Sequence, residues 1–457
     1  MKKHTTKLLA VLLALTFAVV LSACKSNSET AETTTAQTTA AASDDSSAPT
    51  STNTDLFTDR DLDPSYDSAT TIDLNKESSR VTITEAGTYV LTGTLHGQVV
   101  VKVADTDKVQ LVLNNATITN NTSAAIYVQS GDKVFITTAE GSRNTVSSSA
   151  TFTSADEETG DNVDGAIFSK ATLTFNGSGK LTVNCDNGHG VVSKDDLKVT
   201  GGTLDVTAAK KGLAGKDSIR IHDGTITVKA GGDGLHTSND TDTDKGFVYI
   251  EGGSLSIASG DDGIHAETDL SIKGGKISVT QSEEGLEGQN IDISGGTIDI
   301  VSTDDGLNAS EGSSGTDNTD DFGGYGHGGG FGANQNASLT ISGGTIRVNA
   351  QGDALDSNGS MVVSGGTVYV SGPTGGGNGA IDCDNAQITG GTVIAAGSSG
   401  MAMNFSSSST QCAMLVSFDG TVSGGTKVTL QYVLDWKYKA CPYCNPPTRV
   451  SAEAGEM

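Results

Sequence analysis

The chain has 457 residues with only 5% aromatic residues and 59 glycines, which excludes a core built on large aromatic side chains. Its formal net charge of −27 argues against nucleic acid as a partner, because phosphates and an acidic surface repel each other. The many glycines and β-branched residues instead predict numerous short strands joined by tight turns.

The first residues have the order of a secretory signal that ends in a lipidation site. Three lysines precede an apolar run from Leu8 to Leu21, and small residues then lead to Cys24. Residues 1–23 are therefore predicted to be a lipoprotein signal peptide, with Cys24 as the lipid-bearing N-terminus on the extracellular side of a bacterial membrane. The alternative is an ordinary signal peptide followed by a coincidental cysteine.

The next segment has the composition of a tether. Residues 24–54 are rich in serine, threonine and alanine and contain almost no large apolar side chain, so they bury too little surface to fold. We predict a lipid-anchored disordered linker over this range, which lets the folded part stand away from the membrane. Residues 55–430 are predicted to be the folded domain, and residues 431–457 an irregular C-terminal tail of aberrant sequence.

A repeat of about 22 residues decides the fold class. A marker glycine followed by an apolar residue recurs at spacings of 25, 22, 22, 29, 22 and 21 residues, at Gly165, Gly190, Gly212, Gly234, Gly263, Gly285 and Gly306. The period is too short for a propeller blade and lacks the leucine and asparagine pattern of a leucine-rich repeat. It predicts one coil of a parallel β-helix, an all-β solenoid in which equivalent residues stack about 4.8 Å apart.

Irregular parts of the repeat predict loops and a cap. One coil gains residues around Ser238 to Asp244, and a longer insert runs from about Ser310 to Asn336. Insertions in solenoids map to loops, often on the binding face. The strand-rich stretch from Leu56 to Val146 is expected to form the first, less regular coils and to cover the open N-terminal edge.

Five segments, in this order, resemble the polysaccharide-lyase-like carbohydrate-binding β-helix domains of cellulolytic Gram-positive bacteria: Phe57–Tyr66, Ala124–Val128, Ala166–Lys170, Gly215–Arg220 and Gly231–Gly234. The resemblance implies a right-handed, single-stranded parallel β-helix like that of pectate lyases. It also implies bound calcium (Ca2+) and affinity for cellulose and polygalacturonate. Ala214 stands where the family tends to place a basic residue, which argues against carrying over a catalytic role.

Lysines recur at one position of the repeat. Each lies three residues before the apolar residue that starts a strand, at Lys170, Lys194, Lys216 and Lys245. Four ammonium groups one coil apart repel each other unless acids or a polyanion lie between them. The row is interpreted either as a strip that binds uronate carboxylates or as a solvated face of lysine–aspartate pairs.

Acidic residues recur in the later coils. They directly precede the marker position at Asp233, Asp262, Glu284, Asp305 and Asp353, and further acids thicken the row at Asp261, Glu283, Asp304, Glu287 and Asp356. Stacked carboxylates raise one another's pKa or recruit a cation, and calcium suits such a site because it takes six to eight oxygens in flexible geometry. A repelling acidic turn row in solvent is the alternative.

Other features predict chemistry less specifically. His236 and His265 occupy equivalent places in adjacent coils and are candidates for binding a metal or sugar hydroxyls, or for simple polar turn chemistry. The acids of Asp240–Asp244 are read as a plain loop rather than a calcium loop. The aromatic residues of Phe322–Phe331 either stack on sugars or belong to a disordered glycine loop. The Cys441–Cys444 motif lacks the strand–helix context of a redox site.

Three functions remain open. The first and favoured is a non-catalytic, calcium-containing lipoprotein that binds cellulose, polygalacturonate or a related polysaccharide. The second is a calcium-dependent polysaccharide lyase with a lysine or arginine as base, and the scarcity of arginines in the coils, where Arg220 and Arg347 are the candidates, argues against it. The third is a structural or adhesive surface protein, since a β-helix by itself does not determine function.

Overall fold

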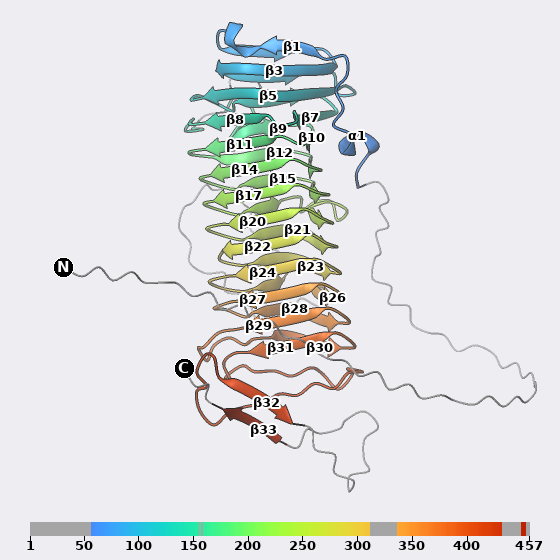
Figure 1. The fold of residues 1–457 in the computed structure, drawn as a ribbon, viewed down its shortest axis with the longest axis vertical. Helices are drawn as coiled ribbons and strands as arrows, with labels where there is room; N and C mark the ends of the chain where they lie inside the picture. The colour runs from blue at the N-terminus through green and yellow to red at the C-terminus, as the bar shows by residue number, and fades with distance from the viewer. Residues whose placement is uncertain (1–55, 154, 157–158, 311–335, 432–448, 454–457) are drawn as a thin grey trace, which may run out of the picture. The chain divides into compact units, whose positions relative to one another are not determined.

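The chain from Asp55 onward forms one compact unit. The structure, a computed structural model, describes residues 56–153, 155–156, 159–310, 336–431 and 449–453. The described part is nearly all β (Figure 1), apart from the short helix α1 (Asp59–Leu62) and the 3-10 turn η1 (Leu74–Lys76). Its strands hydrogen-bond side by side in parallel from one coil to the next, in three ladders. The molecule is therefore a single-stranded parallel β-helix, as the repeat predicts.

Each coil after the first contributes to all three ladders, and long strands bend from one ladder into the next. Ladder 1 contains β1 (Thr70–Asp73), β3 (Gly87–His96), β5 (Lys108–Asn120), β7 (Lys133–Thr138), β10 (Thr172–Gly177), β13 (Asp196–Val199), β16 (Ser218–Ile221), β19 (Phe247–Ile250), β21 (Ile264–Ile272), β23 (Leu286–Ile293), β26 (Ser338–Ile341), β28 (Leu355–Val363) and β30 (Asp382–Ile388).

Ladder 2 continues from the second halves of β3 and β5 through β8 (Arg143–Ser148), β11 (Lys180–Cys185), β14 (Thr203–Ala208), β17 (Thr225–Ala230), β20 (Ser254–Ala258), β22 (Lys276–Gln281), β24 (Thr297–Val301), β27 (Thr345–Asn349), β29 (Thr367–Ser371) and β31 (Thr392–Ala396). Ladder 3 contains β2 (Arg80–Ile83), β4 (Gln98–Lys102), β6 (Ile126–Ser130), β9 (Gly165–Ser169), β12 (His189–Ser193), β15 (Leu213–Gly215), β18 (Leu235–Thr237), β25 (Leu307–Ala309) and the first parts of β21, β23, β28 and β30.

Columns of aliphatic side chains fill the core. Strand β17 alternates exposed and buried residues along its whole length, as a strand with one face toward the core must. One inward column of ladder 2 consists of Leu204, Ile226, Leu255, Ile277, Ile298, Ile346 and Val368, all nearly inaccessible to water. Burying each such side chain stabilises the fold by about 1.5–3 kcal/mol, so the regular column repeats a favourable contribution once per coil.

The marker glycines are required by close packing between coils. A Cβ atom on Gly234 would lie 2.4 Å from Ile257 Cγ2 and 2.5 Å from the carbonyl oxygen of Gly263 in the next coil. In the Gly-Gly turns the second glycine has a positive φ, such as +88° at Gly296, which L side chains rarely adopt. The two glycine signals of the repeat therefore have different physical causes.

The segment around α1 lies beside ladder 1 and not over the N-terminal edge. Lys198 Nζ and Arg220 Nη1 donate to the carbonyl oxygen of Leu56 at 3.0 and 3.1 Å. These two residues belong to β13 and β16, several coils away from β1, where the first ladder begins. The expectation that the chain builds the first coils from Leu56 onward is therefore wrong for this segment.

A buried carboxylate explains this position. Asp61 is fully buried and accepts hydrogen bonds from Lys133 Nζ at 3.0 Å and Thr174 Oγ1 at 2.8 Å, while Lys198 Nζ lies 3.5 Å away. Burial raises the pKa of Asp61, but the backbone hydrogen bond from Thr58 and the charges of Lys198 and Lys133 outweigh it and lower the pKa to about 2. The segment is thus held by an ion pair that joins it to several coils.

The ladders end before residue 430, where the sequence placed the domain boundary. The last ladder strand, β31, ends at Ala396, and residues 397–426 contain no strand. This stretch is rich in serine and lacks the alternation of aliphatic residues that fills the core. Strands β32 (Lys427–Gln431) and β33 (Arg449–Glu453) pair only with each other, so part of the tail predicted to be irregular is extended.

None of the described helices has the length and apolarity needed to cross a bilayer.

Replacing Asp61 by alanine is expected to lower the free energy of unfolding by about 3–5 kcal/mol, because Lys133 and Lys198 would stay buried without their partner. Equilibrium urea unfolding of residues 55–457 measures this change. The exposed Asp67→Ala is the matched control and should change stability by less than about 0.5 kcal/mol. Equal unfolding midpoints for Asp61→Ala and the control would contradict the assignment.

The same carboxylate predicts part of the acid sensitivity. Because the pKa of Asp61 is lowered to about 2 on folding, its stabilising contribution is complete above the unfolded value of about 3.9 and is lost as pH falls toward 2. Unfolding measured between pH 5 and 2 should therefore show a shallower loss of stability for Asp61→Ala than for the parent chain. Parallel curves would show that the ion pair contributes nothing.

Candidate functional site

Acidic side chains are stacked one per coil along the edge where ladder 2 turns into ladder 3. The amide N–H of each marker glycine donates to the backbone carbonyl of the acid in the next coil, from Gly234 to Asp262, Gly263 to Glu284, Gly285 to Asp305 and Gly306 to Asp353, at 2.8–2.9 Å. These bonds fix the acids in register. We call Asp233, Asp262, Glu284, Asp305 and Asp353 the acid row.

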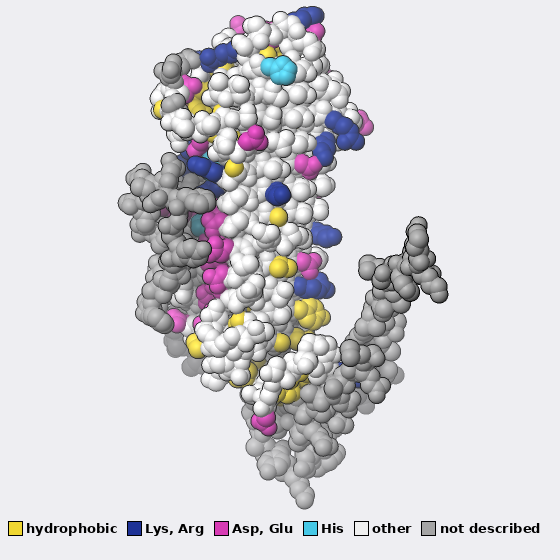
Figure 2. Space-filling view, turned by 90° about the vertical axis from the view of Figure 1, so that its left-hand side faces the viewer, with side chains coloured by type: hydrophobic (Ala, Val, Ile, Leu, Met, Phe, Trp, Pro, Cys, Tyr) yellow, Lys and Arg dark blue, Asp and Glu magenta, His cyan; other side chains and the backbone are white. Residues whose placement is uncertain are grey.

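Two further columns flank the acid row. One contains the exposed Asp261, Glu283 and Asp304, each directly before a member of the row. The other follows the outer side of ladder 3 through His236, His265, Glu287, Asn308 and Asp356, which pair in register. We call the three columns together the acidic edge, and a column of acidic side chains is visible along one side of the helix in Figure 2, with basic side chains beyond its upper end.

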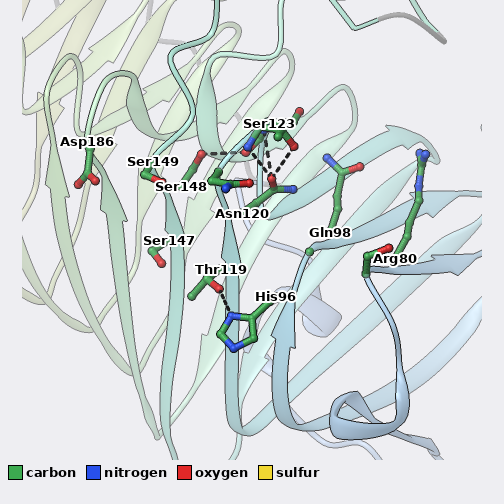
Figure 3. Close-up of a pocket in the computed structure, with 14 residues that line it drawn as sticks. Arg80, His96, Gln98, Thr119, Asn120, Ser123, Ser147, Ser148, Ser149 and Asp186 are labelled. Carbon is green, nitrogen blue, oxygen red and sulfur yellow. Dashed lines mark hydrogen bonds between the residues drawn. The ribbon is translucent and has the colours of Figure 1, made fainter.

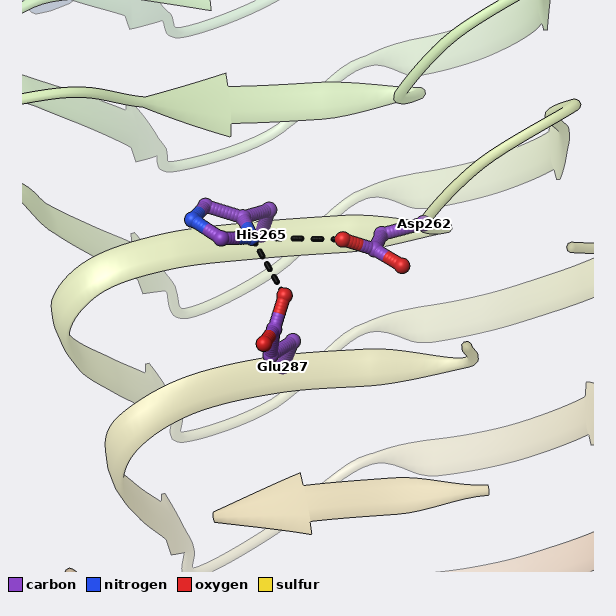
Figure 4. Close-up of side chains that lie close together, drawn as sticks. All are labelled: Asp262, His265 and Glu287. Carbon is purple, nitrogen blue, oxygen red and sulfur yellow. Dashed lines mark hydrogen bonds and ion pairs between the residues drawn. The ribbon is translucent and has the colours of Figure 1, made fainter. Parts of the chain in front are cut away.

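The acidic edge has an upper half, which contains Asp233 and Asp262, and a lower half, which contains Glu284, Asp305 and Asp356. His265 neutralises part of the upper half. Its Nδ1 atom lies 3.2 Å from Asp262 Oδ2 and also contacts Glu287 from the next coil (Figure 4). Burial lowers the pKa of His265, but its contacts with Asp262, Glu267 and Glu287 outweigh burial and raise the pKa well above the ordinary value. Burial likewise raises the pKa of Glu287, yet His265 lowers it to about 2. The three side chains therefore form an imidazolium–carboxylate cluster.

Lys211 and a second histidine, whose own pKa burial lowers, contact the top of the row. Lys211 Nζ lies 3.6 Å from Asp233 Oδ2 and 2.8 Å from His236 Nε2. The His236 ring contacts Asp233 and stacks on His265 with ring centroids 4.7 Å apart. Burial raises the pKa of Asp233, but His236, Lys211 and His265 together lower it. Asp233 is thus compensated by basic groups of the protein itself, whereas burial and the charges of Glu287 and Asp233 outweigh the contact with His265 and raise the pKa of Asp262 to about 8.

The lower half of the edge lacks such compensation. In the described part of the chain, no ion pair with a basic residue reaches Glu284, Asp305 or Asp356. Burial and neighbouring carboxylates raise the pKa of Glu284 to about 9, of Asp305 to about 8 and of Asp356 to about 7. Carboxylates this close hold their charge poorly, so the site favours either protons or a bound cation.

The donor atoms here fit a hard cation. Asn308 is 8% exposed, and its Oδ1 atom is buried without a hydrogen-bond partner, while its Nδ2 donates to Glu284 Oε2 at 2.9 Å. An amide oxygen beside several carboxylates matches the all-oxygen ligand sets that calcium takes. Oxygens of Asp233, Asp261 and Asp262 also lie within 4.8 Å of one another. Calcium therefore fits the chemistry of both halves: the upper acids bring three carboxylates within reach of one ion, and the lower half adds the free amide oxygen of Asn308.

The predicted lysine row lies at the opposite end of the ladder 3 strands. The amides of Lys194 and Lys216 donate to Ser169 and Ser193 of the preceding coils, which places the first three lysines in register. Lys170 pairs with Asp161 at 3.0 Å and Lys245 with Asp217 at 2.7 Å. Lys194 lies over the Phe168 ring at 5.5 Å, and Lys216 is exposed. The row is therefore partly paired, with Lys194 and Lys216 reaching solvent.

The arginines considered for a lyase reaction lie away from the acidic edge. Arg220 is on ladder 1, where it pairs with Asp196 at 3.0 Å. Arg347 is on ladder 2, 3.5 Å from Asp299. Between Asp240 and Asp244, the described loop is closed by Asn239, whose side chain accepts from the amides of residues 241 and 242. That geometry agrees with a plain loop.

Several predicted features lie outside the described residues. These are the lipidation site Cys24, the aromatic insert Phe322–Phe331 and the Cys441–Cys444 motif. Sequence reasoning also missed two residues of the edge, Lys211 and Asn308. Both were detectable, because Lys211 directly precedes the marker Gly212 and Asn308 follows the marker Gly306 by two residues, as His236 follows Gly234.

Comparison with known proteins assigns the family. A family model described as carbohydrate-binding domain-containing protein matches residues 77–319. The chain belongs to this carbohydrate-binding domain family. The matched range contains the lysine row and the acidic edge as far as Asp305, so the resemblance seen in the sequence is confirmed and the family covers most of the candidate site.

Two known proteins are similar to this chain over part of its length. A carbohydrate-binding domain-containing protein from Acetivibrio thermocellus is 36% identical over 136 residues, which is 30% of this chain and 47% of the relative. The chain thus spans about half the length of that curated relative. A solved structure, the gadolinium derivative of a polysaccharide lyase-like protein from C. thermocellum, has 33% identity and a TM-score of 0.44, covering 46% of this chain and 90% of the other.

Asp305→Asn is expected to raise the melting temperature of the calcium-free protein at pH 9 by a few °C, because it removes a half-buried charge, ionised above its raised pKa of about 8, that Asp356 and Asp304 repel. The measurement is thermal unfolding in chelator. Asp299→Asn, on ladder 2 and near Arg347, removes the same charge at an exposed place and should not raise the melting temperature. A lower melting temperature for Asp305→Asn in chelator would contradict the uncompensated edge.

Proposed function

We propose that the protein is an extracellular, lipid-anchored polysaccharide-binding protein that holds cellulose, acidic plant-wall glycans or both through a calcium-containing β-helix. The observation that carries the proposal is the lower half of the acidic edge, where the half-buried carboxylates of Glu284, Asp305 and Asp356 repel one another without a described basic partner. Membership of a carbohydrate-binding family supplies the ligand class.

Calcium would be held by side chains of the lower edge. The carboxylates of Glu284, Asp305 and Asp353, with the unpartnered Oδ1 of Asn308, offer the oxygens. When bound, the ion supplies positive charge that attracts the carboxylate of a uronate unit. The edge alone would repel an acidic glycan, because the whole chain carries a formal charge of −27. Binding of polygalacturonate at this edge should therefore require the ion.

The lysine row supplies a second attraction. Lys194 and Lys216 are exposed and lie one coil apart at the end of the ladder 3 strands. A row of positive charges with the spacing of the coils, about 4.8 Å, suits a polymer that repeats a carboxylate along its length. The lysines would thus orient an acidic glycan chain along the helix axis at their own end of the ladder 3 strands, apart from the calcium site on the acidic edge.

Retention on glycans tests this function. The chain from Asp55 onward, which forms one compact unit, is mixed with polygalacturonate and with insoluble cellulose, in calcium and in chelator. Absorbance of unsaturated uronates is followed in the same samples. We expect calcium-dependent retention on polygalacturonate without growth of absorbance. Steady growth would show a lyase, and no retention on either glycan would leave an adhesive or structural role.

A double variant locates the binding. Glu284→Gln with Asp305→Asn should lower the calcium-dependent retention on polygalacturonate at least tenfold, since it removes two candidate ligands. Asp205→Asn with Asp299→Asn is the matched control, because both acids lie on ladder 2 beside basic partners, Lys180 and Arg347. The control should bind as the parent chain does. Equal loss in the two variants would mean that only net charge matters.

The membrane anchor is tested separately. Cys24→Ser in the full chain is expected to move the protein from the detergent phase to the aqueous phase in a detergent phase separation, because no lipid can be attached. Lys25→Ser, one residue further, should leave the protein in the detergent phase. A Cys24→Ser protein that still partitions into detergent after removal of residues 1–23 would contradict lipidation at this residue.

A further inference from the structure

A groove opens in the first coils, on the same edge at which ladder 2 turns into ladder 3. It has a volume of about 640 Å³ and is lined by residues of five successive turns, among them Arg80, His96, Asn120, Ser148 and Asp186 (Figure 3). Asn120 pairs with Ser148, Ser148 with Cys185 and Cys185 with Ala208 along ladder 2. The groove therefore lies in line with the acidic edge, several coils closer to the N-terminal end.

The chemistry of the groove differs from that of the acidic edge. Its lining consists of serine, threonine, asparagine, glutamine and glycine with one histidine, one arginine and one aspartate. Arg80 and Asp186 lie at opposite ends of it in Figure 3, and their charges cancel. Hydroxyl and amide groups pair with sugar hydroxyls as both donors and acceptors. A net-neutral lining of this kind suits an uncharged sugar better than a uronate.

The floor of the groove is held rigidly by internal hydrogen bonds. The side-chain oxygen of Asn120 accepts from the amide of Thr122 at 2.8 Å and of Ser123 at 3.2 Å. Gln98 Nε2 donates to the carbonyl oxygen of Ala124 at 2.9 Å, and Ser148 Oγ donates to that of Ser123 at 2.8 Å. A preformed floor loses little conformational entropy when a ligand binds.

The rim, in contrast, presents side chains to solvent. His96, Asn121, Ser149 and Asp186 are exposed. His96 Nδ1 lies 2.8 Å from Thr119 Oγ1, which orients the ring beside the groove. Polar groups on an exposed rim above a fixed floor form a site that a polysaccharide chain can enter from the side.

We propose that this groove binds uncharged hexose units of a plant-wall polysaccharide, while the acidic edge takes uronates. The inference rests on the proposed function and divides its two glycan classes between two places on one edge. Binding in the groove needs no cation, because its lining carries no excess charge. Neutral and acidic glycans are then held independently, and one protein can contact a mixed wall at two points.

Cellohexaose and polygalacturonate are the two probes of the test. The variants His96→Ala with Asp186→Ala, and Ser149→Leu, which fills the groove from its rim, are made in the full chain. Both should weaken cellohexaose binding at least tenfold, in chelator as in calcium, as measured by calorimetry. Calcium-dependent retention on polygalacturonate should be unchanged. Asp240→Ala, in an exposed loop outside the groove, is the control, and thermal unfolding verifies that each variant folds.

The outcomes separate this inference from the proposed function. Full cellohexaose binding by both groove variants overturns the groove site, and so does a wild-type chain that binds polygalacturonate but not cellohexaose. Loss of cellohexaose binding in Glu284→Gln with Asp305→Asn, and not in the groove variants, would place neutral glycans on the acidic edge. A wild-type chain that binds neither probe overturns the proposed function itself.

Discussion

One backbone hydrogen bond per coil, from the marker glycine to the carbonyl of the next coil, determines where the side chains of the acid row lie. The bond from Gly285 to Asp305 is 2.9 Å long, and a Cβ atom on Gly285 would lie 2.3 Å from the carbonyl oxygen of Gly306. A larger residue would push the coils apart at the point where the acids are stacked. The same constraint that closes the aliphatic core therefore also forces carboxylates into contact along the outer edge.

The charge along this edge changes with the side chains that fill one repeated position. Lys211 stands at the place that Asp233 and the rest of the acid row occupy in later coils, and the turns of the first coils carry serine and asparagine instead. A solenoid keeps its geometry while such a position varies, since each coil contacts only its neighbours. One edge thus presents a neutral groove, a compensated ion-pair cluster and an uncompensated acidic stretch in order along the axis.

The repeat predicted the fold because each coil repeats its glycines and aliphatic residues at nearly constant spacing, and the stacking of His236 on His265 followed directly from it. What sequence could not predict depends on contacts between distant segments. Asp61 is 72 residues from Lys133, which it binds, so no local pattern indicates that the segment around α1 lies along ladder 1. The sequence also does not indicate which acids of the edge have a basic partner. That depends on which carboxylates Lys211, His236 and His265 contact in space. No sequence pattern predicts the groove, because serine and asparagine are common in turns of every kind.

In the proposed function, acidic glycan and calcium meet at the lower half of the acidic edge. A crystal structure of residues 55–457 grown with calcium and a short oligogalacturonide tests this most directly. It should show a calcium ion about 2.3–2.6 Å from oxygens of Glu284, Asp305 or Asn308, with a sugar carboxylate on the ion. Ordered oligogalacturonide elsewhere on the helix, with this edge free of metal, would contradict the account.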